Sequence, residues 1–209
     1  EVHSKSIRQE NIIFAAAEQL DPSGHTLKIL HLVQEAAGHF NTVWGLKNSG
    51  AKSSIELYFY DYERTFTTTS PNIILNSVSH LLSVDFHVPT ITPFFMWSME
   101  INPTEDQCIK DVDLYFSGAG GTISSGECYT LGVNYYEFKN IYYFFESERD
   151  KELIYEALTS GPRAKIITDL PSFLHPGMAS EQVYVVARKR FSDGIYLSRV
   201  PLDKSIEIL

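Results

Sequence analysis

Apolar and polar side chains alternate along several stretches of this chain, and residues 54–62 show the pattern best. The apolar members of this stretch are Ile55, Leu57 and Phe59, and the opposite members are Glu56, Tyr58, Tyr60 and Tyr62. Successive side chains of a strand point to opposite faces, so the pattern predicts a strand with one buried face. The second face, rich in tyrosine and acid, is either a wet surface or the lining of a pocket.

Similar alternation predicts further strands downstream. They span residues 94–101, 109–117, 127–133, 138–146, 182–191 and 194–200, with a short strand at 164–168. The connection 102–107 is short enough for a hairpin between the first two of these strands. The turn at 192–194 predicts a second hairpin between the last two strands.

Helical periodicity fills most of the remaining chain. Residues 25–47 carry apolar side chains at steps of three and four, which predicts one long amphipathic helix that ends at Asn48–Gly50. Further helices are expected at 7–19, at 71–82 with Pro71 in the first turn, and at 148–160, with the start of another at 203–209.

These elements predict an α+β fold with a strongly curved antiparallel sheet or barrel. Amphipathic helices would cover its outer face, and the tyrosine- and acid-rich face would be the inner one. An open sheet leaves that inner face in water, whereas closure turns it into a lumen. The chain has 209 residues, 44% of them hydrophobic, and no linker-like stretch divides it. A single domain spanning residues 1–209 is therefore expected.

The predicted inner face gathers the candidate site residues. Glu56 and Glu100 are the candidate catalytic acids, because a carboxyl partly removed from water is suited to acid or base chemistry. Tyrosine rings supply stacking area and hydroxyls, and an arginine can anchor an acidic group. The candidate substrate-binding residues are Tyr58, Tyr60, Asp113, Tyr115, Tyr142, Tyr184, Arg188 and Tyr196. In the alternative interpretation, these charges pair with each other or face solvent.

The net charge and the cysteine content limit the classes of binding partner and the cellular compartment that we expect. A net charge of −9 argues against nucleic acid and against an anionic membrane surface, since both require a basic patch. No apolar run approaches the ~20 residues of a membrane span. Cys108 and Cys128 are too few for a disulfide framework, which favours reduced thiols and a cytoplasmic location. A small molecule is the expected partner, and the oligomeric state stays open.

The sequence contains only weak motifs for binding a metal ion or a phosphate group. The histidines show no HxxxH or HxH pair and the cysteines no CxxC, so no zinc site is expected. Asp111 and Asp113 form a DxD pair that could hold Mg²⁺, but two acids on one strand face are ordinary. The Gly118–Gly121 loop is not followed by a helix, as a phosphate-binding loop would be. We expect no cofactor and no bound metal.

The order of elements over residues 25–209, helix followed by strands in repeat, resembles the αββα repeats of the ABBA-barrel aromatic prenyltransferases. In that family, helices surround an antiparallel barrel whose lumen holds the substrates. The resemblance implies that Glu56 or Glu100 orients the acceptor and that Arg188 holds a diphosphate. It also implies a shield for an allylic cation formed by Tyr58, Tyr60, Tyr115, Tyr142, Tyr184 and Tyr196.

Three classes of function follow from this sequence. The first is an enzyme of specialised metabolism that acts on an aromatic or isoprenoid-like small molecule, by prenyl transfer or by acid-catalysed cyclisation or isomerisation. The second is a non-catalytic binding protein for a hydrophobic ligand, and the third is an interaction module with an open sheet. The net acidic inner face suits a neutral or amine-bearing ligand better than a diphosphate.

Overall fold

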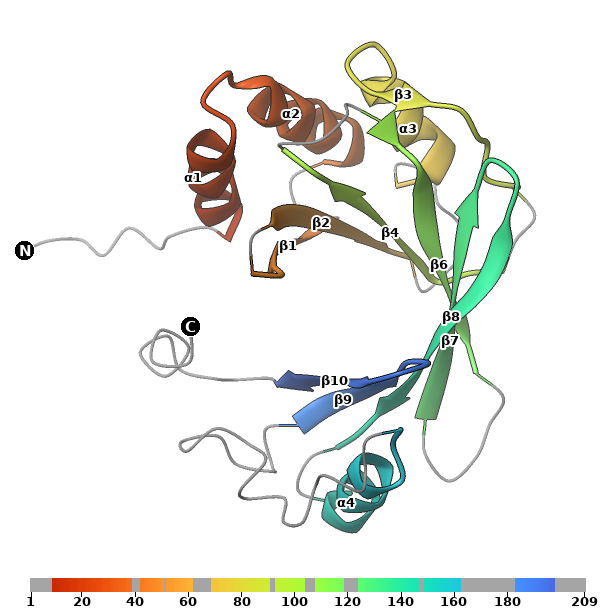
Figure 1. The fold of residues 1–209 in the computed structure, drawn as a ribbon. Helices are drawn as coiled ribbons and strands as arrows, with labels where there is room; N and C mark the ends of the chain where they lie inside the picture. The colour runs from red at the N-terminus through yellow and green to blue at the C-terminus, as the bar shows by residue number, and fades with distance from the viewer. Residues whose placement is uncertain are drawn as a thin grey trace, which may run out of the picture. The chain divides into compact units, whose positions relative to one another are not determined.

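A computed structural model describes residues 9–38, 42–50, 52–61, 69–90, 93–103, 108–118, 124–146, 149–162 and 183–197. These residues form four helices and ten strands, so the predicted α+β class is confirmed (Figure 1). The helices are α1 (Gln9–Leu20), α2 (His25–Ala37), α3 (Pro71–Val78) and α4 (Lys151–Thr159). The strands are β1 (Thr42–Asn48), β2 (Ser53–Tyr60), β3 (Ser83–Val84), β4 (Met96–Ile101), β5 (Cys108–Ile109), β6 (Asp111–Ser117), β7 (Ser124–Gly132), β8 (Tyr136–Phe144), β9 (Val183–Arg188) and β10 (Asp193–Leu197).

Eight of the strands form one antiparallel sheet in the order β1-β2-β4-β6-β7-β8-β9-β10. The predicted hairpins are present, because β4 pairs with β6 and β9 pairs with β10, both antiparallel. β3 and β5 form a separate parallel ladder of two residues each. The antiparallel order explains why the alternation was readable in the sequence, since such sheets often have one apolar face and one polar face.

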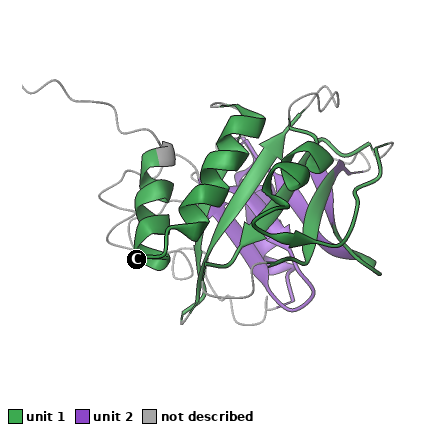
Figure 2. Ribbon diagram, turned by 90° about the horizontal axis from the view of Figure 1, so that it is seen from above, with its two compact units in different colours: residues 1–115, 130–137 green, residues 116–129, 138–209 purple. Residues whose placement is uncertain are grey.

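The chain divides into two compact units (Figure 2). Unit 1 contains residues 1–115 and 130–137, and unit 2 contains residues 116–129 and 138–209. Strands β6, β7 and β8 each contribute residues to both units. One sheet therefore runs through both units, and the expectation of a single domain stays a prediction.

In unit 1, α1, α2 and α3 cover the apolar face of the sheet (Figure 1). Leu57 and Phe59 of β2 and Trp97 of β4 are fully buried there. The Phe59 and Trp97 rings stack with 4.2 Å between centroids, and the Trp97 indole N–H donates to the Thr69 carbonyl at 2.7 Å. Full burial of such side chains contributes about 1.5–3 kcal/mol each. This core holds the opposite face of β2 and β4 in place.

In unit 2, α4 packs against the sheet through its own apolar stripe. Ile154, Ala157 and Leu158 face Val183 and Val186 of β9 in a buried cluster. The spacing of the three helical positions, i, i+3 and i+4, places them on one side of α4. The predicted helix at 148–160 and the predicted strands on which it packs are confirmed at this point.

The long helix predicted at 25–47 is wrong. Helix α2 ends at Ala37, and β1 begins at Thr42. Gly38 ends the helix with φ 84° and ψ 162°, a backbone conformation that is almost confined to glycine. The apolar side chains of 42–46 continued the three- and four-residue spacing by coincidence, because Trp44 and Leu46 are alternate residues of a strand.

The other predicted elements agree with the structure, with small shifts at their ends. Helix α1 covers the described part of 7–19, and α3 ends at Val78 rather than at residue 82. The predicted strand at 164–168 and the helix start at 203–209 lie outside the described residues. None of the described helices has the length and apolar character that a membrane crossing needs.

Candidate functional site

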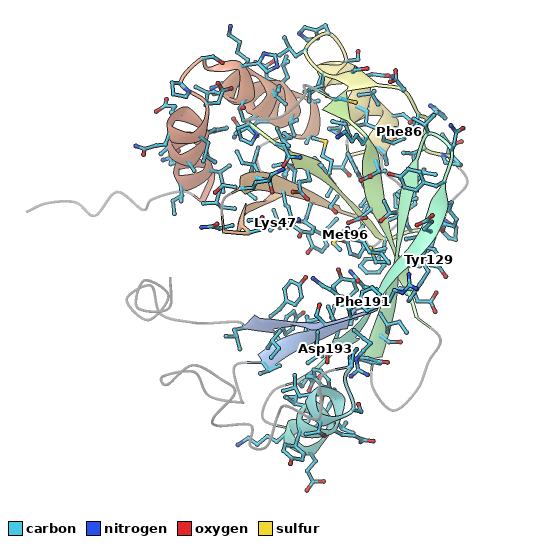
Figure 3. The ribbon with its side chains drawn as sticks, in the orientation of Figure 1. Lys47, Phe86, Met96, Tyr129, Phe191 and Asp193 are labelled. Atoms are coloured by element: carbon cyan, nitrogen blue, oxygen red, sulfur yellow. The ribbon has the colours of Figure 1, made fainter. Side chains whose placement is uncertain are left out.

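Six of the predicted site residues share one face of the sheet in unit 1. Cross-strand pairing joins Glu56 to Glu100, Tyr58 to Ser98 and Tyr60 to Met96, and β6 continues the same rows. Because directly paired residues point to the same side, this face lies opposite α1–α3 (Figure 3). The six predicted residues are Glu56, Tyr58, Tyr60, Glu100, Asp113 and Tyr115. We call this surface the acid–tyrosine face.

Lys47, a residue that the sequence patterns did not single out, lies on the edge strand β1 and contacts both acids of this face. Lys47 Nζ is 2.8 Å from Glu100 Oε2 and 3.5 Å from Glu56 Oε1. The Ser54 hydroxyl donates to Glu100 Oε1 at 2.6 Å, and the Tyr58 hydroxyl donates to Glu56 Oε2 at 2.6 Å. The two carboxylates thus share one ammonium group. Lys47 was not predicted here because its stretch has the spacing of a helix, whereas it belongs to strand β1 beside β2.

Two opposing effects act on the pKa of Lys47. Burial alone would lower this pKa, because it disfavours the charged ammonium. The hydrogen bond with Glu100 and the negative charges of Glu100 and Glu56 outweigh burial, and the pKa is raised above its usual range. Lys47 is therefore a cation at neutral pH, held between two acids.

The acid–tyrosine face is only half removed from water. The side chains of Glu56 and Glu100 are 28% and 37% exposed, so neither carboxyl lies in a dry pocket. Met96, Ser98 and Tyr115, in the middle of the face, are buried. The face therefore combines solvent-accessible charges with a covered apolar and hydroxyl-bearing centre. This combination suits a ligand that has one polar end.

The aspartates of β6 are engaged by neighbouring hydroxyls. The Thr130 hydroxyl donates to Asp113 Oδ1 at 2.7 Å, and the Tyr135 hydroxyl donates to Asp111. The hydrogen bond with Asp111, followed by burial, raises the pKa of Tyr135 to about 12. Among the described residues, no group of three His, Cys, Asp or Glu side chains is arranged to hold a metal ion. The DxD pair thus has a hydrogen-bonding role within the sheet.

Three predicted tyrosines of unit 2 make aromatic contacts with each other or with Phe144. The ring centroids of Tyr142 and Tyr196 are 6.1 Å apart, and those of Phe144 and Tyr184 are 6.5 Å apart. Tyr142 lies directly opposite Ala187 on β9, on the side of the sheet away from α4.

Arg188 does not share a face with Tyr142, so its predicted placement is wrong. It lies opposite Ile141, on the α4 side. Its Nε donates to Asp193 Oδ1 at 2.8 Å, Nη1 donates to the Ser160 carbonyl at 3.2 Å, and Nη2 donates to the Ala157 carbonyl. The error arose because Val183, Val185, Val186 and Ala187 are all buried, so β9 offers no alternation from which to read its phase. Arg188 therefore ties β9 and β10 to the C-terminal end of α4.

A small pocket in unit 1 adjoins Glu100. It has room for about one water molecule. Within the described part of the chain, the buried Nε2 of His25 has no hydrogen-bond partner. Cys108 is partly accessible, and Cys128 is fully buried, as expected of a structural thiol. The pocket is lined by His25, Thr26, Ile29, Leu82, Glu100, Ile101, Asn102, Pro103, Cys108 and Ile109.

Comparisons of the chain with known protein families, with curated proteins and with solved structures give no match. The resemblance to the ABBA-barrel prenyltransferases stays a prediction, as does the cytoplasmic location.

Proposed function

We propose that the acid–tyrosine face of unit 1 binds a small aromatic molecule that carries an amine. The observation that supports this proposal most directly is the pair of carboxylates, Glu56 and Glu100, bridged by the ammonium of Lys47. Two acids on directly paired residues repel each other unless a cation lies between them. The face is thus built to hold a cation.

An amine-bearing ligand would use the position that Lys47 now occupies. The Lys47 side chain is 47% exposed, so it can swing into water without uncovering a core. The ammonium of the ligand would then take the place of Lys47 and donate charge-assisted hydrogen bonds to the same two carboxylates. This exchange makes Lys47 a competitor of the ligand rather than a partner.

The aromatic part of the ligand is inferred from the tyrosines of β2. Tyr58 is half-buried beside the ion pair, and Tyr60, two residues further along the strand, is more exposed. Their rings provide apolar area and stacking surfaces within reach of a group anchored on Glu56. Gly45 of β1 is paired with Glu56 of β2, and the Tyr58 ring lies close to the backbone of Gly45. A planar ring attached to the amine is the complementary shape.

Acid–base catalysis at Glu56 is the second candidate, because the Tyr58 hydroxyl donates to its carboxylate at 2.6 Å. Such a pair can pass a proton between ligand and solvent. Conversion of a bound amine, detected by mass spectrometry and lost in Tyr58→Phe, would favour catalysis over binding alone. Prenyl transfer has weaker support, since the guanidinium proposed to hold a diphosphate is bound to α4 and Asp193.

The test is a calorimetric titration with tyramine, and with 4-ethylphenol as the same ring without the amine. We expect saturable binding of tyramine that is at least ten-fold tighter than binding of 4-ethylphenol. Glu56→Gln should weaken tyramine binding at least five-fold, while Glu152→Gln, an exposed acid at the start of α4, should leave it unchanged.

Lys47→Met separates a binding site from a purely structural ion pair. Removal of the competing ammonium should tighten tyramine binding several-fold. Unchanged or weaker binding in Lys47→Met, in a variant that retains its circular dichroism spectrum, would contradict the proposal. Saturable binding of dimethylallyl diphosphate, with or without Mg²⁺, would instead favour the prenyl-transfer prediction.

A further inference from the structure

The small pocket of unit 1 is lined by both a thiol and an imidazole. Cys108 belongs to β5 and is paired with Ser83 of β3, and His25 is the first residue of α2. Both residues line the pocket, which has room for about one water molecule. A small molecule in this pocket is therefore within reach of both side chains.

The Nε2 atom of His25 is a buried polar atom that lacks a partner. It forms no hydrogen bond within the described part of the chain. A buried polar atom without a partner costs about 1–3 kcal/mol, and such atoms are rare outside catalytic or redox sites. In the neutral imidazole that carries its proton on Nδ1, Nε2 is the nitrogen that can accept a proton.

Two other polar side chains of the pocket already have partners. The Thr26 hydroxyl donates to the Asp21 carboxylate at 2.8 Å, and the Glu100 carboxylate accepts from Lys47 at 2.8 Å. Among the described residues, the ionisable groups that line the pocket are this paired carboxylate, the imidazole and the thiol. The imidazole and the thiol are thus the groups that a molecule in the pocket can engage.

The two cysteines of the chain differ in accessibility. Cys108 is partly accessible, whereas Cys128 is fully buried. A thiol reacts through its thiolate, so a reactive cysteine needs both access for the reagent and a nearby group that accepts its proton. Cys108 has access and shares its pocket with the imidazole. Cys128 lacks access and serves as an internal reference.

We propose that Cys108 is a modification site, at which hydrogen peroxide oxidises the thiol to a sulfenic acid. His25 Nε2 takes the thiol proton, and the thiolate sulfur attacks one oxygen of the peroxide. The S–O bond forms as the O–O bond breaks, and the leaving hydroxide takes the proton from His25 to give water. The sulfur is oxidised and the peroxide is reduced, so no further reactant is needed. This reaction requires no ligand on the acid–tyrosine face.

The test is oxidation by hydrogen peroxide in the presence of dimedone, which labels sulfenic acids, with the label at each cysteine quantified by mass spectrometry. We expect Cys108 of the folded chain to be labelled at least ten-fold faster than Cys108 of the chain unfolded in urea. A thiol that is only exposed gains access on unfolding, so it would react more slowly in the folded chain. Cys128 should be labelled only after unfolding.

His25→Gln tests the role of the imidazole. Glutamine still forms hydrogen bonds but is not a base, so the labelling rate of Cys108 at pH 7 should fall at least five-fold. The difference from wild type should decrease towards pH 10, because thiols in water ionise unaided near pH 8.5. His80→Gln, at an exposed histidine of unit 1, should leave the rate unchanged.

Three results would overturn the proposal: labelling of Cys108 that is no faster in the folded chain, an unchanged rate in His25→Gln, or a loss in His25→Gln that is the same at pH 7 and pH 10. The last result would mean that His25 only shapes the pocket. If His25→Gln loses its circular dichroism spectrum, the pH dependence of wild-type labelling replaces it. A rate already near its maximum at pH 7 supports the proposal, and a rate that rises with pH like that of a thiol in water contradicts it.

Discussion

Asp21 joins the end of α1 to the first turn of α2. Its Oδ1 accepts hydrogen bonds from the Ser23 N–H at 3.0 Å and from the Ser23 hydroxyl at 2.5 Å. Its Oδ2 accepts from the Thr26 N–H at 2.7 Å and from the Thr26 hydroxyl at 2.8 Å. The Ser23 hydroxyl and then the Thr26 N–H lower the pKa of Asp21 far below its usual range, against the effect of burial. The carboxylate thus satisfies N–H groups that the start of a helix leaves without partners.

We expect Asp21→Asn to lower the free energy of unfolding by about 1.5–3 kcal/mol at pH 7, because the amide has one acceptor oxygen where the carboxylate uses two, and hydrogen bonds to the charged group are lost. Because the folded-state pKa is lowered, the contribution of Asp21 is fully present above the unfolded value of about 4. It is lost as the pH falls from there towards the folded pKa. We therefore expect the difference in the free energy of unfolding between wild type and Asp21→Asn to decrease below about pH 4. Urea denaturation between pH 3 and 8 measures this difference.

The control for this residue is Asp85→Asn. Asp85 is exposed, and its contacts with the Ser83 hydroxyl are long, at 3.4 Å. Its removal should leave stability nearly unchanged at every pH. An Asp21→Asn variant whose stability runs parallel to that of the wild type down to pH 3 would show that the carboxylate is not the stabilising group.

At the scale of elements, Arg188 connects α4 to the β9–β10 hairpin. Its guanidinium reaches two carbonyls in the last turn of α4, where a cation also opposes the helix dipole. Arg188→Gln removes these bonds and leaves Asp193 without its cation, so we expect a loss of about 2–3 kcal/mol in the free energy of unfolding. Chemical denaturation followed by circular dichroism measures this loss.

Arg149→Gln is the matched control for this element. Arg149 also pairs with acids next to α4, but its side chain is 69% exposed, against 23% for Arg188. Exposed ion pairs are screened by water, so Arg149→Gln should have little effect. Equal losses in the two variants would mean that the contacts of Arg188 with the end of α4 are not what stabilises the element.

Local patterns predicted most of these elements, and the exceptions have identifiable causes. Strand β2 was readable because Leu57 and Phe59 alternate with Glu56 and Tyr58, and this alternation is a property of the strand alone. Strand β1 was not readable, because a helical spacing continued past Gly38 by chance. Gly38 itself was the available signal for that boundary, because a glycine commonly follows the last residue of a helix.

The candidate site could be predicted only as a list of residues on one face. Lys47 meets Glu100 because β1 and β4 both lie next to β2, and strand order is not encoded in the alternation of any one strand. Which side chains of β9 point to each face also depends on its partner strands. A register shift between Tyr196 and Leu197 of β10 changes this pairing further. Pairings of this kind are determined by tertiary packing, so Arg188 was assigned to the wrong face.

At the scale of the whole molecule, one sheet is common to two compact units. Strands β6, β7 and β8 start in one unit and end in the other, so neither unit can lose these strands without affecting its neighbour. This connectivity favours a single cooperative unfolding transition, as the expectation of one domain requires. Units that unfolded separately would have to break the same three strands in the middle.

The two tryptophans make this expectation testable, because Trp44 and Trp97 both lie in unit 1. Tryptophan fluorescence reports the unfolding of unit 1, whereas far-ultraviolet circular dichroism reports both units. Arg188→Gln removes contacts that lie entirely in unit 2. If the shared sheet couples the units, this variant should lower the urea midpoint seen by fluorescence as much as the midpoint seen by circular dichroism.

Separate unfolding predicts a different pair of curves for Arg188→Gln. The fluorescence midpoint would stay at its wild-type value, because the contacts around Phe59 and Trp97 are unchanged, and circular dichroism would show two transitions. Asp21→Asn, a change in unit 1, supplies the reciprocal comparison and should shift both signals together if the units are coupled. If both midpoints shift together in both variants, a loss of stability in one unit also destabilises the other. The strands that belong to both units account for this coupling.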